Sequence, residues 1–174
     1  MQGFKNAFNS EWLSRYKQWV EALLYALFCF MLPFILSHSS QQLLLGTLVN
    51  ATIIIAATRL ELKHLLSVIL FPVFGVLSAG ALFGSLTPYL LLLVPFIWAG
   101  NAVLAFSFKH FNESFAFKAL IGATAKALVI GVSAFTLFSF SMLPAALLLP
   151  MSAMQFVTAL LGALVAFIAL NAKN

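Results

Sequence analysis

The chain contains six long apolar stretches, and eight of its nine lysine and arginine residues lie at or beyond the ends of these stretches, on one side of the bundle that they imply. The stretches cover approximately residues 18–36, 41–58, 65–83, 88–108, 118–140 and 150–170. Each is close to the roughly 20 residues that a helix needs to cross a hydrocarbon core about 30 Å thick. The pattern predicts an all-α polytopic membrane protein with six transmembrane helices in one bundle.

The composition favours the same class. Hydrophobic residues make up 63% of the chain and charged residues 7%, which is far less charge than a soluble surface carries. The 174 residues suit a single domain, 1–174. The net charge of +5 does not indicate a nucleic-acid partner, because the positive residues are spread over several loops without a binding motif.

The positive residues also predict an orientation. They flank the chain ends and every second connection: Lys5, Arg15, Lys17, Arg59, Lys63, Lys109, Lys118 and Lys173. The other connections, 38–42, 84–87 and 141–149, contain neither lysine nor arginine. Because cytoplasmic loops are enriched in these residues, we expect a multi-pass protein of the cell membrane with both termini in the cytoplasm.

The segment 1–17 carries aromatic residues at every fourth position, from Phe4 through Tyr16. This spacing predicts a short amphipathic helix that lies at the cytoplasmic interface, with Asn9 or Ser10 capping a helix that starts at Glu11. The first apolar run begins too late and is too long for a cleavable signal peptide. The alternative is a frayed tail with aromatic anchors.

Lys126 is the one basic residue in the interior of an apolar stretch. With a span that begins at 118, it lies about 12 Å from the cytoplasmic boundary. Its neighbours at helical spacing are mostly small, for example Gly122 and Ala123, so we expect the lysine to point into the bundle. A buried ammonium needs a polar partner or a water-filled cavity. The alternative is a lysine that snorkels to the surface.

Three amides occupy similar depths in other spans. Asn50 lies near the middle of the second, Asn101 lies in the fourth, one turn from Trp98, and Gln155 lies in the sixth. Amides in hydrocarbon need hydrogen-bond partners. We therefore interpret Lys126 together with these four residues as a candidate ligand-binding site, with interhelical hydrogen bonding as the structural alternative.

Ala22 and Ala26 form a pair of small residues one helical turn apart in the first span. Such pairs allow close helix packing, so the alanines favour either packing within the bundle or a docking face for another membrane protein.

Several kinds of chemistry are not indicated. The chain has no aspartate, and its four glutamates lie at or near the predicted cytoplasmic boundary, so a carboxylate pair for acid–base catalysis is not expected. Neither a phosphate-binding glycine-rich motif nor a nucleophile–base pair is visible, which predicts a protein that is not an enzyme and has no cofactor. The Glu61/His64 and His110/Glu113 pairs are interpreted as solvated loop residues and not as metal ligands.

The stretch from Gly46 to Asn101 resembles a known family. The segments that carry the resemblance are Leu48–Ala51, Leu70–Pro72 and Val94–Asn101, together with Lys126 and Met154–Gly162. They are similar to small six-helix membrane proteins related to the substrate-binding S components of energy-coupling factor (ECF) transporters, some of which are loosely labelled "iron hydrogenase". This sequence has one cysteine and therefore no cluster to hold iron.

The resemblance implies a bundle that captures a small molecule from outside the cell. Its implied partners are a transmembrane coupling protein and two cytoplasmic ATPases, with Ala22 and Ala26 at the positions where S components meet the coupling protein. The expected function is a substrate-binding subunit for uptake of a micronutrient. The alternatives are a stand-alone membrane channel or carrier, and a membrane scaffold without transport activity.

Overall fold

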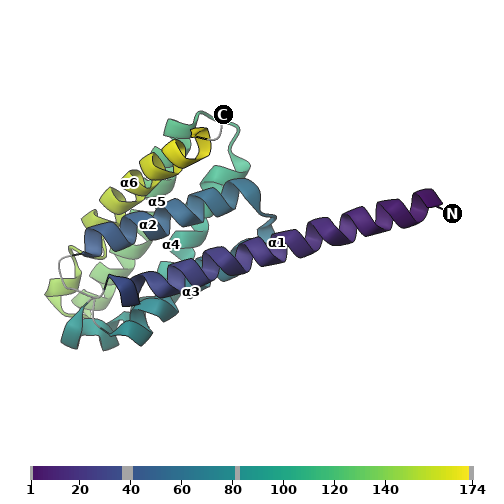
Figure 1. The fold of residues 1–174 in the computed structure, drawn as a ribbon. Helices are drawn as coiled ribbons and strands as arrows, with labels where there is room; N and C mark the ends of the chain where they lie inside the picture. The colour runs from purple at the N-terminus through teal and green to yellow at the C-terminus, as the bar shows by residue number, and fades with distance from the viewer. Residues whose placement is uncertain (1, 37–40, 81–82, 173–174) are drawn as a thin grey trace.

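The computed structural model describes residues 2–36, 41–80 and 83–172. Within these ranges the regular secondary structure is entirely helical (Figure 1). The helices are α1 (Gln2–Ile35), α2 (Gln42–Arg59), α3 (Leu62–Ala79), η1 (Gly84–Tyr89), α4 (Leu90–His110), α5 (Phe115–Ser139), η2 (Ala145–Leu147) and α6 (Ala153–Asn171). In the described part of the chain, six helices are long and apolar enough to cross a membrane. This confirms the prediction of an all-α chain with six helices of that kind.

The predicted helix start at Glu11 is wrong. α1 is one helix of 34 residues, and it begins at Gln2, not at Glu11. No glycine or proline lies between Glu11 and Leu32, so nothing in the sequence interrupts the helix there. The N-terminal part of α1 therefore continues in line with its membrane-capable part, Arg15–Ile35, and projects beyond the other helices (Figure 1).

α2 is the central helix of the bundle. It packs against α1, α3, α4 and α6, and its 18 residues include ten that are buried. α5 packs against α4 and α6. Because α2 is surrounded on most sides, a polar side chain on it is buried and needs a hydrogen-bond partner. Asn50 of α2 is such a residue.

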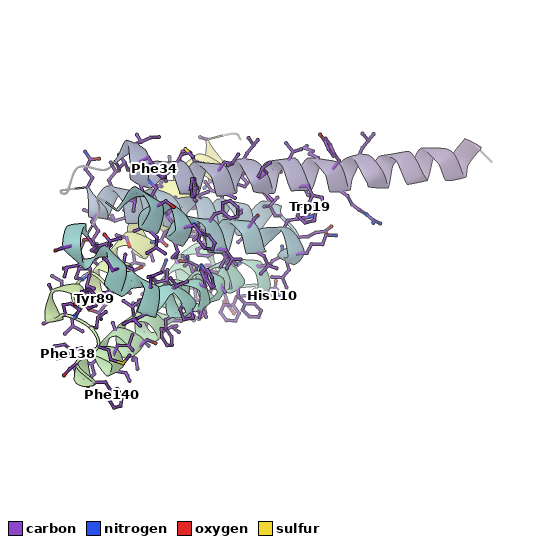
Figure 2. All side chains as sticks on the ribbon, turned by 90° about the horizontal axis from the view of Figure 1, so that it is seen from below. Trp19, Phe34, Tyr89, His110, Phe138 and Phe140 are labelled. Atoms are coloured by element: carbon purple, nitrogen blue, oxygen red, sulfur yellow. The ribbon has the colours of Figure 1, made fainter. Side chains whose placement is uncertain are left out.

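The connections gather at two ends of the bundle. At one end, which we call the basic end, α2 joins α3 and α4 joins α5, with Arg59, Lys63 and Lys109 nearby. At the other end, which we call the neutral end, lie 83–89 and 140–152, which contain neither lysine nor arginine. Exposed aromatic side chains occur at both ends: Trp19 at the basic end, and Phe34, Tyr89, Phe138 and Phe140 at the neutral end (Figure 2). Aromatic residues at both ends are typical of membrane–water interfaces.

Glycines permit the closest helix contacts. A Cβ atom at Gly75 of α3 would lie 2.5 Å from the carbonyl oxygen of Phe30 on α1. A Cβ atom at Gly162 of α6 would lie 2.6 Å from the Cβ atom of Asn50 and 2.8 Å from the carbonyl oxygen of Thr47, both on α2. The α2–α6 approach brings the middle of α6 against the polar residue at the centre of α2.

Candidate functional site

Lys126 donates hydrogen bonds to two asparagine side chains from two other helices. Its Nζ atom lies 2.5 Å from Oδ1 of Asn50 on α2 and 2.7 Å from Oδ1 of Asn101 on α4. The three residues are buried, with exposed fractions of 3% for Lys126, 1% for Asn50 and 2% for Asn101. The structure thus brings together three of the five residues that the sequence suggested for a ligand site.

Lys126 lies deeper than its sequence position suggested. α5 begins at Phe115, three residues before the predicted start, so Lys126 is eleven residues into the helix, or about 16 Å from its first residue. This is near the middle of a helix of 25 residues. At this depth the side chain is turned inward and does not snorkel, because its ammonium is held by the two amides.

Asn50 is held in place from both sides of its amide. While Oδ1 accepts from Lys126, Nδ2 donates to Oγ1 of Thr158 on α6 at 3.2 Å. Thr158 in turn donates to the carbonyl oxygen of Met154 at 2.8 Å. The oxygen of Asn50 is therefore oriented toward the lysine by a bond that its nitrogen makes to a fourth helix.

Asn101 and Trp98 connect α4 to the backbone of α3. Asn101 Nδ2 donates to the carbonyl oxygen of Ile69, and Trp98 Nε1 donates to that of Leu70, both at 3.2 Å. These carbonyls lie in the turn before Pro72, and a carbonyl oxygen has a second lone pair beside its helical bond. The bond to Ile69 orients Oδ1 of Asn101 toward Lys126, as Thr158 does for Asn50.

Close packing between helices explains how these short side chains meet. Gly100 sits directly against α5, because a Cβ atom there would lie 2.8 Å from Ile130 and 3.3 Å from Cγ of Lys126. Gly46 sits against Thr158 in the same way, at 2.8 Å from Cγ2. Small residues next to each polar residue therefore bring α2, α4, α5 and α6 close enough for direct hydrogen bonds.

A cavity of about 100 Å³ adjoins the buried lysine. Most of its wall is apolar, and its polar residues include Lys126, Asn50, Asn101, Thr158 and Gln155. The end of the cavity that is farther from Lys126 is lined by Phe83 and Met151 of the neutral end. Gln42 and Leu90, the first residues of α2 and α4, also line it there. From Gln42 to Asn50 the helix rises by about 12 Å, so the cavity reaches from the neutral end to the middle of the bundle.

The remaining predicted site residues have different positions. Gln155 lines the cavity, and its Nε2 atom donates to the carbonyl oxygen of Pro150 at 3.3 Å. Trp98 is half-buried, contacts Phe74 and is not among the lining residues. The structure thus brings Gln155 to the same cavity as Lys126 and places Trp98 at the α3–α4 contact, outside the lining of the cavity.

Ala22 and Ala26 are both buried inside the bundle, with exposed fractions of 1% and 0%. α1 packs against α3 and, over a smaller area, against α2. In this structure the pair serves internal helix packing and is not on a surface that another protein can reach.

A second buried polar contact occurs at the basic end. Nδ1 of His64 on α3 lies 2.8 Å from Oε1 of Gln18 on α1, and the same oxygen accepts from the backbone N–H of Glu61 at 3.1 Å. The Trp19 ring packs edge-on against the His64 ring, with centroids 4.5 Å apart. Over the described residues, no three His, Cys, Asp or Glu side chains come together to hold a metal ion, and His64 instead joins α1 to α3.

Glu61 itself is exposed beside this contact. Its carboxylate forms an ion pair of 2.8 Å with Lys63, and the hydrogen bond and charge of that ammonium lower the pKa of the glutamate. The side chains of Glu61 and His64 therefore have different partners, Lys63 and Gln18.

Sequence reasoning did not assign a site role to Thr158 or to the carbonyl oxygens of Ile69 and Leu70. A signal for Thr158 existed, since it lies three residues after Gln155 on the same helical face. Backbone acceptors leave no such signal, because every residue has a carbonyl and only the packing of α4 on α3 selects these two.

No family model, curated protein or solved structure matches this chain.

Proposed function

We propose that the protein is a substrate-binding membrane subunit, similar to an ECF S component, for the uptake of a small molecule or micronutrient. The observation that carries the proposal is the cavity that runs from the neutral end to Lys126. By the distribution of lysine and arginine the neutral end faces outward, with both termini in the cytoplasm of a multi-pass cell-membrane protein. A site reached from that side suits a protein that captures a molecule from outside.

The composition of the cavity supports binding as its role. Ligand sites are concave and mostly apolar, with a few oriented polar groups that fix the ligand. Here Lys126 is oriented by Asn50 and Asn101, and each amide is oriented in turn by Thr158 or the Ile69 carbonyl. A polar group held by three helices keeps its geometry when a ligand arrives, and so loses little conformational freedom on binding.

The sequence offers no nucleotide-binding motif, so energy for uptake would come from partners. We propose a transmembrane coupling protein and two ATPases as these partners. Because Ala22 and Ala26 are buried, contact with the coupling protein would use other residues, such as the exposed apolar residues of α1.

Native mass spectrometry of the gently solubilised protein tests this proposal. We expect the wild type to retain a small molecule and the Lys126→Met variant to lose it, although both proteins are folded to the same extent. As a matched control, Val132→Met changes an exposed position of the same helix and should keep the molecule. Retention that is unchanged in Lys126→Met would contradict the proposal.

A transport measurement separates the subunit from the stand-alone carrier. The purified chain in liposomes is expected to bind the retained molecule without moving it across the bilayer. Steady flux by this chain alone would instead identify a carrier or channel.

A further inference from the structure

We propose that the cavity recognises a small monocarboxylate: an anionic head bound by Lys126 and a short apolar tail along the cavity wall. This deepens the proposed function and rests on it for the location of the site. The charge and the free donor of Lys126, together with the apolar wall of the cavity, point to this chemical class of ligand.

Lys126 has more hydrogen-bond donors than the described part of the protein uses. An ammonium group has three N–H bonds. In the described residues, Lys126 uses two of them, toward Asn50 and Asn101. Since Lys126 also lines the cavity, its third donor is available to an acceptor placed there.

The positive charge of Lys126 is not neutralised by the residues that hold it. The two protein groups that hold Lys126 are neutral amides, so they satisfy donors without neutralising the ammonium. The chain has no aspartate, and its glutamates are Glu11, Glu21, Glu61 and Glu113, all outside the wall of the cavity. Burying one unneutralised charge at the centre of a membrane helix is costly. A ligand carboxylate removes that penalty, whereas an amine adds to it.

The N-terminus of α2 lies at the mouth of the cavity. α2 begins at Gln42, which lines the cavity, and its N-cap residue Gln41 makes no side-chain capping bond. The positive end of the α2 dipole thus lies at the neutral end and attracts an entering anion.

The wall and the size of the cavity define the rest of the ligand. Between Lys126 and the neutral end, the wall of the cavity is formed mainly by aliphatic side chains such as Val49, Val73 and Val76. A volume of about 100 Å³ holds several non-hydrogen atoms, since one water requires roughly 10–15 Å³ by the same kind of measure. A carboxylate with a tail of a few carbons fits both properties.

Equilibrium dialysis of radiolabelled butanoate against the full-length protein in nanodiscs tests the inference. Butanamide and butylamine serve as competitors, because they share the tail and differ only in the head group. We expect saturable butanoate binding at pH 7 that is displaced by unlabelled butanoate at least tenfold better than by butanamide, and not by butylamine. Equal displacement by the neutral or the cationic analogue would overturn the carboxylate assignment.

Two variants locate the binding. Lys126→Met should weaken butanoate binding at least tenfold. Val76→Phe places a ring in the cavity near the neutral end and leaves the lysine unchanged, and it should also abolish butanoate binding. With two different variants, the test does not depend on the folding of either one. Val132→Phe adds the same ring to an exposed site of α5 and should bind as the wild type does. Binding that survives Val76→Phe would contradict the inference.

Decanoate distinguishes a small soluble acid from a membrane fatty acid. Its chain exceeds the cavity, so it should displace butanoate no better than butanoate itself does. Displacement at a tenfold lower concentration would overturn the small-acid assignment in favour of a lipid.

The two proposals fail separately. If the molecule retained in mass spectrometry is neutral or cationic, the substrate-binding function stands and the carboxylate inference fails. If butanoate binds through Lys126 but the cells show no uptake that depends on this protein, the ligand class stands and the transport function fails.

Discussion

Lys126 on α5 donates a hydrogen bond of 2.5 Å to Asn50 on α2, although α5 packs against α4 and α6. The long lysine side chain reaches between those helices to the centre of the bundle. With Asn101 as the second acceptor and Thr158 behind Asn50, a single hydrogen-bonded cluster connects α2, α4, α5 and α6. The packing of these helices and the proposed ligand site therefore depend on the same few atoms.

Replacing the lysine separates those two roles. Lys126→Met should preserve the fold and lower the free energy of unfolding by about 1–3 kcal/mol, because Oδ1 of Asn50 and of Asn101 each lose a buried donor. Unfolding by SDS titration in mixed micelles measures the change. The double variant Lys126→Met/Asn101→Leu should be less destabilised than the sum of the single variants, since the orphaned oxygen is gone. Strict additivity would show that the bond has no energetic weight.

The α2–α6 contact is expected to tolerate no side chain at Gly162. In Gly162→Ala the new methyl group would overlap Asn50 and the backbone of α2, at 2.6 Å and 2.8 Å, and backbone atoms cannot rotate away. We expect a loss of about 1–3 kcal/mol, the usual range for overpacking. The thermal midpoint in detergent, followed by circular dichroism, reports it. Gly131→Ala is the control, because its nearest neighbour, at 3.1 Å, is the side chain of Ser152. Equal midpoints for the two variants would contradict this account.

The orientation can be tested by cysteine labelling. After Cys29 is replaced by alanine, Ser85→Cys and Ser141→Cys at the neutral end should react with a membrane-impermeant maleimide in intact cells. Asn112→Cys, in the exposed connection between α4 and α5, should react only after permeabilisation. The reverse pattern would place the neutral end in the cytoplasm and with it the opening of the cavity.

Gln18 is expected to hold α1 against the start of α3. Its Oε1 atom accepts from His64 and from the backbone of Glu61, so Gln18→Leu leaves both donors without their partner. Amide hydrogen exchange of Glu61 and the first turn of α3 should become faster by about tenfold, which corresponds to about 1.4 kcal/mol and lies in the range for a lost hydrogen bond. Lys17→Met, at an exposed neighbouring position, should leave the exchange unchanged. Unaltered exchange in Gln18→Leu would mean that apolar packing alone fixes the junction.

The helical spans could be predicted because membrane helices are defined by length and apolarity, both of which are local properties. The predicted spans for α2, α4 and α6 begin and end within three residues of the observed helices. The third differs more, since α3 ends at Ala79 and not at 83, where Gly80 adopts a left-handed conformation with φ 65° that ends the helix. The start of α1 was missed because aromatic spacing suggested a separate segment, whereas no glycine or proline lies between Phe4 and Leu32 to interrupt the helix.

The sequence by itself determined that Lys126, Asn50 and Asn101 need partners, because polar groups in an apolar bundle cannot remain unpaired. Spacing along the chain did not determine that they are one another's partners. That depends on which faces of α2, α4 and α5 meet, and on the glycines at 100 and 162 that let the helices approach. The same packing decided that Trp98 lies at the α3–α4 contact, that Thr158 belongs to the cluster, and that Ala22 and Ala26 are internal. Helix formation is local, whereas the contacts between helices are properties of the folded chain.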